Sequence, residues 1–323
     1  MQTIESLQQR ISKAFSDLEF PGTPADLYDP ISYTLKLGGK RLRPFLVLAS
    51  CDMFGGNLEE AIHPAIAIEI FHNFTLLHDD LMDQAPLRRG KETVYKKWNA
   101  NIAILAGDTM FAFANRYMLR TRKEVIPDLL DLLNQTAIEV CEGQQFDMDF
   151  ETSTDVTIVG YLEMIRLKTA VLLACSLKTG AVIAGADPIQ AESLYHFGIN
   201  VGIAFQLMDD LLDVYGSEDK FGKVPGGDIM IGKKTFLYLK ALELSGNDAE
   251  NFKNLYQSHD LPGDNKIEAV RFQFDKLGVN ELTHREIACY WDKAIKIMNT
   301  LDLPPESTRP LMSYCANLMD RDY

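Results

Sequence analysis

Residues 72–90 read "HNFTLLHDDLMDQAPLRRG" and end an apolar stretch that begins near residue 62. Within 62–82 the apolar residues recur at spacings of three and four, which is the period of an α-helix. Three aspartates lie at the end of this stretch, and a pair of arginines follows shortly after. The stretch therefore predicts an apolar helix whose last turn carries acid and is followed by a basic loop.

The same helical spacing extends through most of the chain, and the alternation typical of strands is scarce. Inner segments such as "AVLLACSLKTGAVIAGA" (170–186) are apolar nearly all round, as expected of a helix at the centre of a large bundle. We predict an all-α fold, a large single-domain bundle of long helices covering 1–323. The predicted helices are 4–18, 42–54, 62–82, 101–119, 126–145, 159–184, 191–213, 234–245, 265–277 and 284–301.

Composition and net charge limit the kinds of function that the chain can have. The chain has 323 residues, 46% of them hydrophobic, and a formal net charge of −14. Nucleic-acid binding requires a basic face, so this acidity argues against it. The apolar runs are shorter than the roughly 20 residues of a membrane span, and we see no targeting segment. Five scattered cysteines, which we expect to be buried free thiols, favour a reducing, cytoplasmic location: Cys51, Cys141, Cys175, Cys289 and Cys315.

An acidic pattern occurs twice. "HDDLMD" (78–83) resembles "MDDLLD" (208–213), and each ends an apolar helical run. On a helix the first and last aspartates of such a motif share a face, and the middle one lies about 100° away. The face pairs are Asp79 with Asp83 and Asp209 with Asp213, and the flanking residues are Asp80 and Asp210.

Carboxylates in apolar surroundings require cations. Carboxylate oxygens favour a hard ion, of which Mg²⁺ is the expected one. Mg²⁺ usually takes one or two carboxylates and completes its shell with water and substrate phosphate. The two motifs therefore predict several Mg²⁺ ions that bridge to a substrate carrying phosphate.

Basic residues occur beside these motifs and in glycine-rich segments. "GGKRLRP" (38–44) places three cations beside two glycines, and "FGKVPGGDIMIGKKT" (221–235) is a glycine-rich segment with three lysines. Arginine forks suit phosphate oxygens, and glycine-rich segments suit a lid that closes over a substrate. We interpret these cations as phosphate contacts in an otherwise acidic protein.

From residue 38 onward the chain resembles the all-trans polyprenyl diphosphate synthases. The markers that carry the resemblance are "GGKRLRP", "HDDLMD" with "LRRG", "AGD" (106–108), "LKTA" (167–170), "GIAFQLMDDLLDVYG" (202–216) and "GK...GGDI..GKKT". The resemblance implies the type I isoprenoid synthase fold, a homodimer of helical bundles around a central apolar cavity. Two alternatives stay open: a related class I terpenoid synthase, although such enzymes usually replace the second acidic motif, and a non-catalytic partner subunit, although such subunits typically lose one motif.

The resemblance implies a role for each matching residue. The first motif would bind Mg²⁺ on the diphosphate of an allylic primer through Asp79 and Asp83, and the second through Asp209, with Asp210 and Asp213 in support. The same diphosphate would be contacted by Arg88, Lys168, Lys223 and Lys233. Isopentenyl diphosphate would be held by Lys40, Arg43, His72 and Arg89. Thr169 and Gln206 would place oxygens near the allylic cation.

Product length is expected to depend on the residues four and five positions before the first motif, which act as a floor in the family. Phe74 is bulky and Thr75 is small, which predicts a C15 or C20 product, farnesyl or geranylgeranyl diphosphate. The preferred primer stays open, and residues 245–280 carry no recognisable motif.

Overall fold

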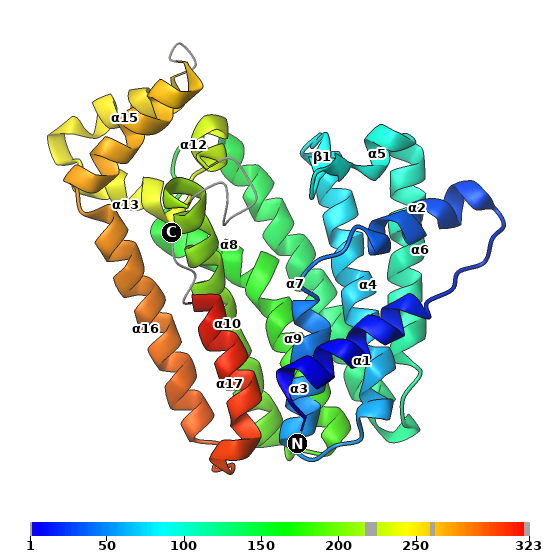
Figure 1. Ribbon diagram of the computed structural model, residues 1–323. Helices are drawn as coiled ribbons and strands as arrows, with labels where there is room; N and C mark the ends of the chain where they lie inside the picture. The colour runs from blue at the N-terminus through cyan, green and yellow to red at the C-terminus, as the bar shows by residue number, and fades with distance from the viewer. Residues whose placement is uncertain (1, 217–224, 259–261, 320–323) are drawn as a thin grey trace. The chain divides into compact units, whose positions relative to one another are not determined.

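The computed structural model describes residues 2–216, 225–258 and 262–319 (Figure 1). Within these residues the only strands form one short antiparallel hairpin, β1 (Leu87–Arg88) with β2 (Lys91–Glu92). The all-α prediction is confirmed. The helices up to residue 152 are α1 (Ile4–Ser16), α2 (Ala25–Lys36), α3 (Leu42–Met53), α4 (Leu58–Met82), α5 (Val94–Lys97), α6 (Ala100–Met118) and α7 (Ile126–Thr152).

The later helices begin with α8 and include one π-helical turn. They are α8 (Ile158–Ile165), the π turn (Arg166–Ala170), α9 (Val171–Ala184), α10 (Pro188–Tyr215), α12 (Gly227–Ile231), α13 (Phe236–Leu244), α14 (Ala249–Gln257), α15 (Gly263–Lys276), α16 (Val279–Asn299) and α17 (Pro305–Met319). Two short 3₁₀ turns occur at Lys123–Val125 and Gly246–Asp248.

The chain divides into two compact units. The first comprises 1–136, 175–195 and 303–312, and the second comprises 137–174, 196–302 and 313–323. The unit boundaries fall inside α7, α9, α10 and α17 and between α16 and α17. The single-domain organisation over 1–323 stays a prediction.

In the first unit, α4 packs against α3 and α6, and Figure 1 shows α4 and α6 side by side. Asn57 caps the start of α4 by accepting from the Glu59 N–H at 3.1 Å. Most side chains in the middle of α4 are buried, because neighbours cover several of its faces. The helix therefore carries its last turn, with the first acidic motif, on a rigid support.

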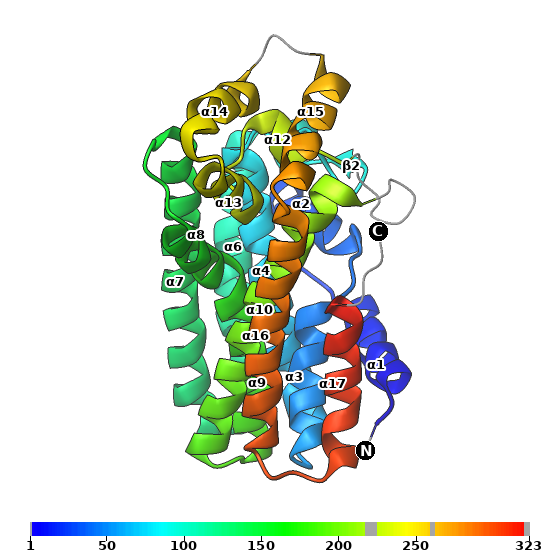
Figure 2. The same ribbon diagram turned by 90° about the vertical axis from the view of Figure 1, so that its left-hand side faces the viewer.

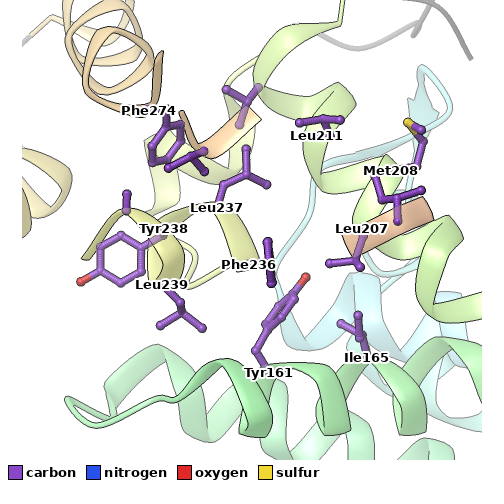
Figure 3. Close-up of a cluster of buried hydrophobic side chains, with 14 of the residues drawn as sticks. Tyr161, Ile165, Leu207, Met208, Leu211, Phe236, Leu237, Tyr238, Leu239 and Phe274 are labelled. Carbon is purple, nitrogen blue, oxygen red and sulfur yellow. The ribbon is translucent and has the colours of Figure 1, made fainter. Parts of the chain in front are cut away.

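In the second unit, an apolar cluster joins α8, α10 and α13. Figure 3 shows Tyr161 rising from α8 toward Phe236 and Leu207. α14 packs against α13 and α15, and Figure 2 shows α14 and α15 at one end of this unit. The segment 245–280, which had no motif, thus contributes helices that pack against α13.

Burial bears on two sequence expectations. Among the described residues one stretch, Ile158–Ala184, is long and apolar enough to cross a membrane, so the expectation that every apolar run is too short was wrong; 72% of its apolar window is buried inside the protein. None of the five cysteines, all of them in the described part of the chain, forms a disulfide, but Cys141 and Cys289 are exposed, so the predicted burial of these two was wrong. Cys289 shares a helix face with the polar residues Glu286 and Lys293, three and four positions away.

Candidate active site

The first acidic motif occupies the C-terminal end of α4. Asp79 is half-buried, Asp80 is buried and Asp83 is the exposed C-cap, whose N–H donates to the Asp79 carbonyl at 2.9 Å. The helix dipole disfavours acids at this end, and no basic residue lies in the last turn of α4. These carboxylates therefore require cations from elsewhere.

Arg88 from β1 supplies one such cation. Its Nη2 lies 2.6 Å from Asp80 Oδ1, its Nε donates to the same oxygen at 2.9 Å, and its Nη2 lies 3.9 Å from Asp79 Oδ2. Burial raises the pKa of Asp80 even though Arg88 opposes the shift. Asp80 is thus the buried ion-pair partner of Arg88.

Basic residues from two loops gather beside α4. Arg89 follows β1 with a φ of 55°, and its guanidinium lies against Gly39, where a Cβ would be 2.7 Å from Arg89 Nη2. Gly39 itself has a φ of 133°, so this close approach requires glycine. The buried Nε of Arg43 makes no hydrogen bond within the described residues. An unpartnered buried donor among arginines is suited to an anion.

His72 lies in the same basic cluster. Burial, together with the charges of Arg43, Arg89 and other arginines, holds the pKa of His72 well below its ordinary value of 6.5. The imidazole is therefore neutral at neutral pH and binds through hydrogen bonds rather than through charge.

This neutral state predicts an acid-dependent loss of stability. Below pH 6.5 the unfolded chain binds a proton at His72 that the folded protein does not bind, so the free energy of unfolding falls as the pH falls. We expect the wild-type protein to lose more stability than His72→Gln between about pH 7.5 and about pH 5.5. Urea unfolding at both pH values measures the difference, and equal losses would contradict a depressed pKa.

The second acidic motif lies near the C-terminal end of α10. Asp210 is 3% exposed, and both of its carboxylate oxygens accept hydrogen bonds, from the Tyr161 hydroxyl and from Gln206 Nε2 at 3.0 Å. The Gln206 amide oxygen accepts from Thr169 Oγ1 at 3.1 Å. Burial, reinforced by the charge of Asp228, raises the pKa of Asp210 to about 8. A single chain of hydrogen bonds thus links Thr169, Gln206, Asp210 and Tyr161.

The third aspartate of this motif supports a neighbouring helix. Asp213 Oδ2 accepts from the backbone N–H of Asp228 at 2.9 Å, in the first turn of α12. The Lys233 N–H donates in turn to the Asp228 carbonyl at 2.8 Å. Asp213 therefore fixes the segment that leads to Lys233.

Two lysines of this unit converge on one carboxylate. Lys168 Nζ donates to Asp147 Oδ2 at 2.6 Å, and Lys233 Nζ lies 3.8 Å from the same oxygen. Burial alone would raise the pKa of Asp147, but the two lysines hold it below its ordinary value. Lys168 lies on the π-helical turn, which approaches α7 so closely that a Cβ at Gly143 would be 2.3 Å from the Lys168 nitrogen.

The donor set suits a hard divalent ion. Within the described residues no three His, Cys, Asp or Glu side chains gather into a metal-binding group. Mg²⁺ needs only one or two carboxylates when substrate phosphate completes its shell, so the half-buried Asp79 and Asp209 fit this use.

A family model described as polyprenyl synthetase matches residues 24–272, more than half of the chain. The chain belongs to the polyprenyl synthetase family. A geranylgeranyl diphosphate synthase of Methanosarcina mazei is 41% identical over 242 residues, which are 74% of this chain and 75% of that protein. A geranylfarnesyl diphosphate synthase of Natronomonas pharaonis is 35% identical and covers 99% of this chain and 97% of its own. A crystal structure of a geranylgeranyl pyrophosphate synthase superposes with a TM-score of 0.95 at 46% identity, covering 100% of both chains.

Family membership confirms the main predictions. The protein is a trans-prenyltransferase with the isoprenoid synthase fold, and it condenses isopentenyl diphosphate with an allylic diphosphate. The individual site residues stay predictions, although the described residues bring Arg88 to the first motif, Arg89 to the "GGKRLRP" loop and Lys168 to Lys233. Lys223 lies outside the described residues.

Three residues of this polyprenyl synthetase were missed by sequence reasoning. Asp147 joins Lys168 to Lys233, Tyr161 donates to Asp210, and Glu69 pairs with an arginine of the "GGKRLRP" loop. Only Glu69 left a signal in the sequence, as a lone acid in the apolar stretch that leads to the first motif.

Proposed function

We propose that this enzyme makes an all-trans C15 or C20 diphosphate, farnesyl or geranylgeranyl diphosphate, with Mg²⁺ at both aspartate motifs. The observation that carries the proposal is the pair of acidic helix ends, each with cations beside it. The relatives named geranylgeranyl synthases support the chain length.

In the proposed reaction, the allylic diphosphate binds to Arg88, Lys168 and Lys233, with Lys223 as a further proposed contact. Asp79 and Asp83 would hold Mg²⁺, as would Asp209 with Asp210 and Asp213. Bound Mg²⁺ supplies a Lewis acid that neutralises charge on the diphosphate oxygens. The basic side chains stabilise the departing pyrophosphate, so that the primer C–O bond ionises to an allylic cation.

The second substrate binds at the basic cluster beside α4. Lys40, Arg43 and Arg89 hold the diphosphate of isopentenyl diphosphate, and the neutral His72 adds a hydrogen bond. The double bond of this substrate attacks the allylic cation and forms the new C–C bond. A proton then leaves the resulting carbocation for the released pyrophosphate, which restores a double bond. Thr169 and Gln206, already joined at 3.1 Å, present oxygens that stabilise the positive charge.

The length of the product is proposed to depend on Phe74. Its ring packs against Phe71, Phe111 of α6 and His78, with ring centroids 4.8–5.6 Å apart. The Thr75 hydroxyl instead donates to the His72 carbonyl of its own helix at 2.8 Å. Phe74 is thus the rigid element of the two-residue floor.

We expect Phe74→Ala to lengthen the main product by at least one isoprene unit, because the floor loses its ring. Thin-layer or mass analysis of products measures the change. Thr75→Ala is the matched control and should leave a C15 or C20 product. An unchanged product from Phe74→Ala would remove Phe74 from the floor.

Labelled isopentenyl diphosphate tests the proposed function. The purified chain, given Mg²⁺ and dimethylallyl, geranyl or farnesyl diphosphate in separate reactions, should release pyrophosphate and yield a C15 or C20 diphosphate. A main product of C30 or longer would contradict the length. A hydrocarbon product would indicate a terpenoid cyclase, and activity only after adding a partner protein would indicate a subunit.

We further propose a cytoplasmic homodimer. The adjacent α6 residues Ile104 and Leu105 are 44% and 58% exposed, which supports an apolar contact with a second copy. Light scattering of the purified protein should give twice the mass of one chain, and the mass of a single chain would contradict the dimer.

A further inference from the structure

Glu69 of α4 is a buried acid that the proposed reaction does not use. The residue is 2% exposed and lies ten positions before Asp79. Its Oε1 accepts from Arg41 Nη1 at 2.9 Å and from Asn73 Nδ2 at 3.3 Å, and its buried Oε2 accepts no hydrogen bond from the described residues. A carboxylate is kept in such a place only when neighbouring charges balance it.

Arg41 connects Glu69 to the segment 38–44, in which Lys40 precedes α3 and Arg43 lies in the first turn of that helix. Arg41 has a left-handed φ of 48° and is the N-cap of α3. Its guanidinium also donates to the Leu35 carbonyl and lies 4.3 Å from the centre of the Phe15 ring. Because a left-handed conformation is unfavourable for arginine, these contacts hold the turn.

Glu69 also acts on the two other arginines of the cluster. Burial lowers the pKa of Arg43 to about 10 and lowers that of Arg89, and in both cases Glu69 is the main opposing charge. Arg89 packs against Gly39 of the same loop. One carboxylate therefore lies among three arginines, from two segments of the chain, that would otherwise repel one another.

We propose that Glu69 is a positioning residue for isopentenyl diphosphate: its carboxylate fixes Arg41, and with it the turn into α3 that presents Lys40 and Arg43 to the diphosphate. The proposal rests on the proposed function, which assigns this basic cluster to isopentenyl diphosphate. Simple electrostatics predicts the opposite effect, because removing a negative charge strengthens the attraction for an anionic substrate. The sign of the change in KM therefore separates positioning from charge alone.

The test is Glu69→Gln, which keeps the size of the side chain and removes its charge. We expect the KM for isopentenyl diphosphate to rise about tenfold, with the KM for the allylic diphosphate and the kcat nearly unchanged. Glu59→Gln is the matched control, because Glu59 lies on the same helix and pairs with Arg10 at an exposed site. A lowered or unchanged KM for isopentenyl diphosphate would overturn the proposal.

Arg41→Gln removes the other partner of the ion pair between Arg41 and Glu69. It should reproduce the selective rise in KM, and the double variant should be no worse than either single variant, because both remove one interaction. If Glu69→Gln does not fold, Arg41→Lys replaces it, because lysine keeps the positive charge but loses the forked contacts to Glu69 and the Leu35 carbonyl, and an unchanged KM overturns the proposal. Arg89→Met tests the proposed function separately from the role of Glu69. An unchanged KM for isopentenyl diphosphate in this variant would reject the assignment of the basic cluster to isopentenyl diphosphate.

Discussion

Replacement of Asp79 by asparagine is expected to lower kcat/KM about 10³-fold while the protein stays folded. The asparagine keeps the shape of the side chain but removes the charge that would hold Mg²⁺. The same change relieves an unfavourable acid at the C-terminal end of α4, so the Tm should stay equal or rise slightly. Steady-state pyrophosphate release and thermal unfolding measure the two effects.

Asp131→Asn is the control for this prediction, because Asp131 is an exposed helical aspartate of α7 outside the proposed site. It should leave kcat/KM unchanged. An Asp79→Asn protein that keeps more than about a tenth of the wild-type kcat/KM would show that the first motif does not carry the ionisation step.

Removal of Arg88 is expected to affect both stability and activity. Arg88→Met leaves the buried Asp80 without its ion pair, and we expect the free energy of unfolding to fall by about 2 kcal/mol. Protonation of Asp80 limits the loss, because burial already raises its pKa. Activity should fall as well, since the proposed diphosphate contact is lost. Denaturant unfolding and kcat/KM give the two values.

The double variant Arg88→Met/Asp80→Asn separates these effects. It should regain most of the lost stability but none of the activity, because it removes the buried charge without restoring the diphosphate contact. Arg10→Met is the control: its pair with Glu59 is exposed, so it should cost no more than about 0.5 kcal/mol. Recovery of activity in the double variant would remove Arg88 from the diphosphate site.

Sequence reasoning predicted the long helices well where the apolar period was uninterrupted. The predicted 62–82 became α4 (Leu58–Met82), and 191–213 became α10 (Pro188–Tyr215). Three helices of nine residues or more, α2, α14 and α17, were missed. Both α2 and α17 contain an internal proline, Pro30 or Pro310, and proline ordinarily marks the end of a helical pattern.

The site residues that form sequence motifs could be predicted. The site residues that act through contacts with residues distant in sequence could not. The two aspartate motifs are readable because three acids at the end of an apolar run are unusual. Asp147 is an ordinary acid in its own segment and gains meaning only when Lys168, on the π-helical turn, reaches it at 2.6 Å. Tyr161 likewise needs Asp210, 49 positions away.

Dependence of substrate binding on Mg²⁺ tests the central claim most directly. Calorimetric titration of the wild-type protein with an unreactive allylic thiodiphosphate should show tight binding with Mg²⁺ and at least about tenfold weaker binding in EDTA. Asp79→Asn and Asp209→Asn should each reduce the gain from Mg²⁺. Equal affinity with and without Mg²⁺ in the wild-type protein would contradict the claim that the two aspartate motifs hold the allylic diphosphate through metal ions.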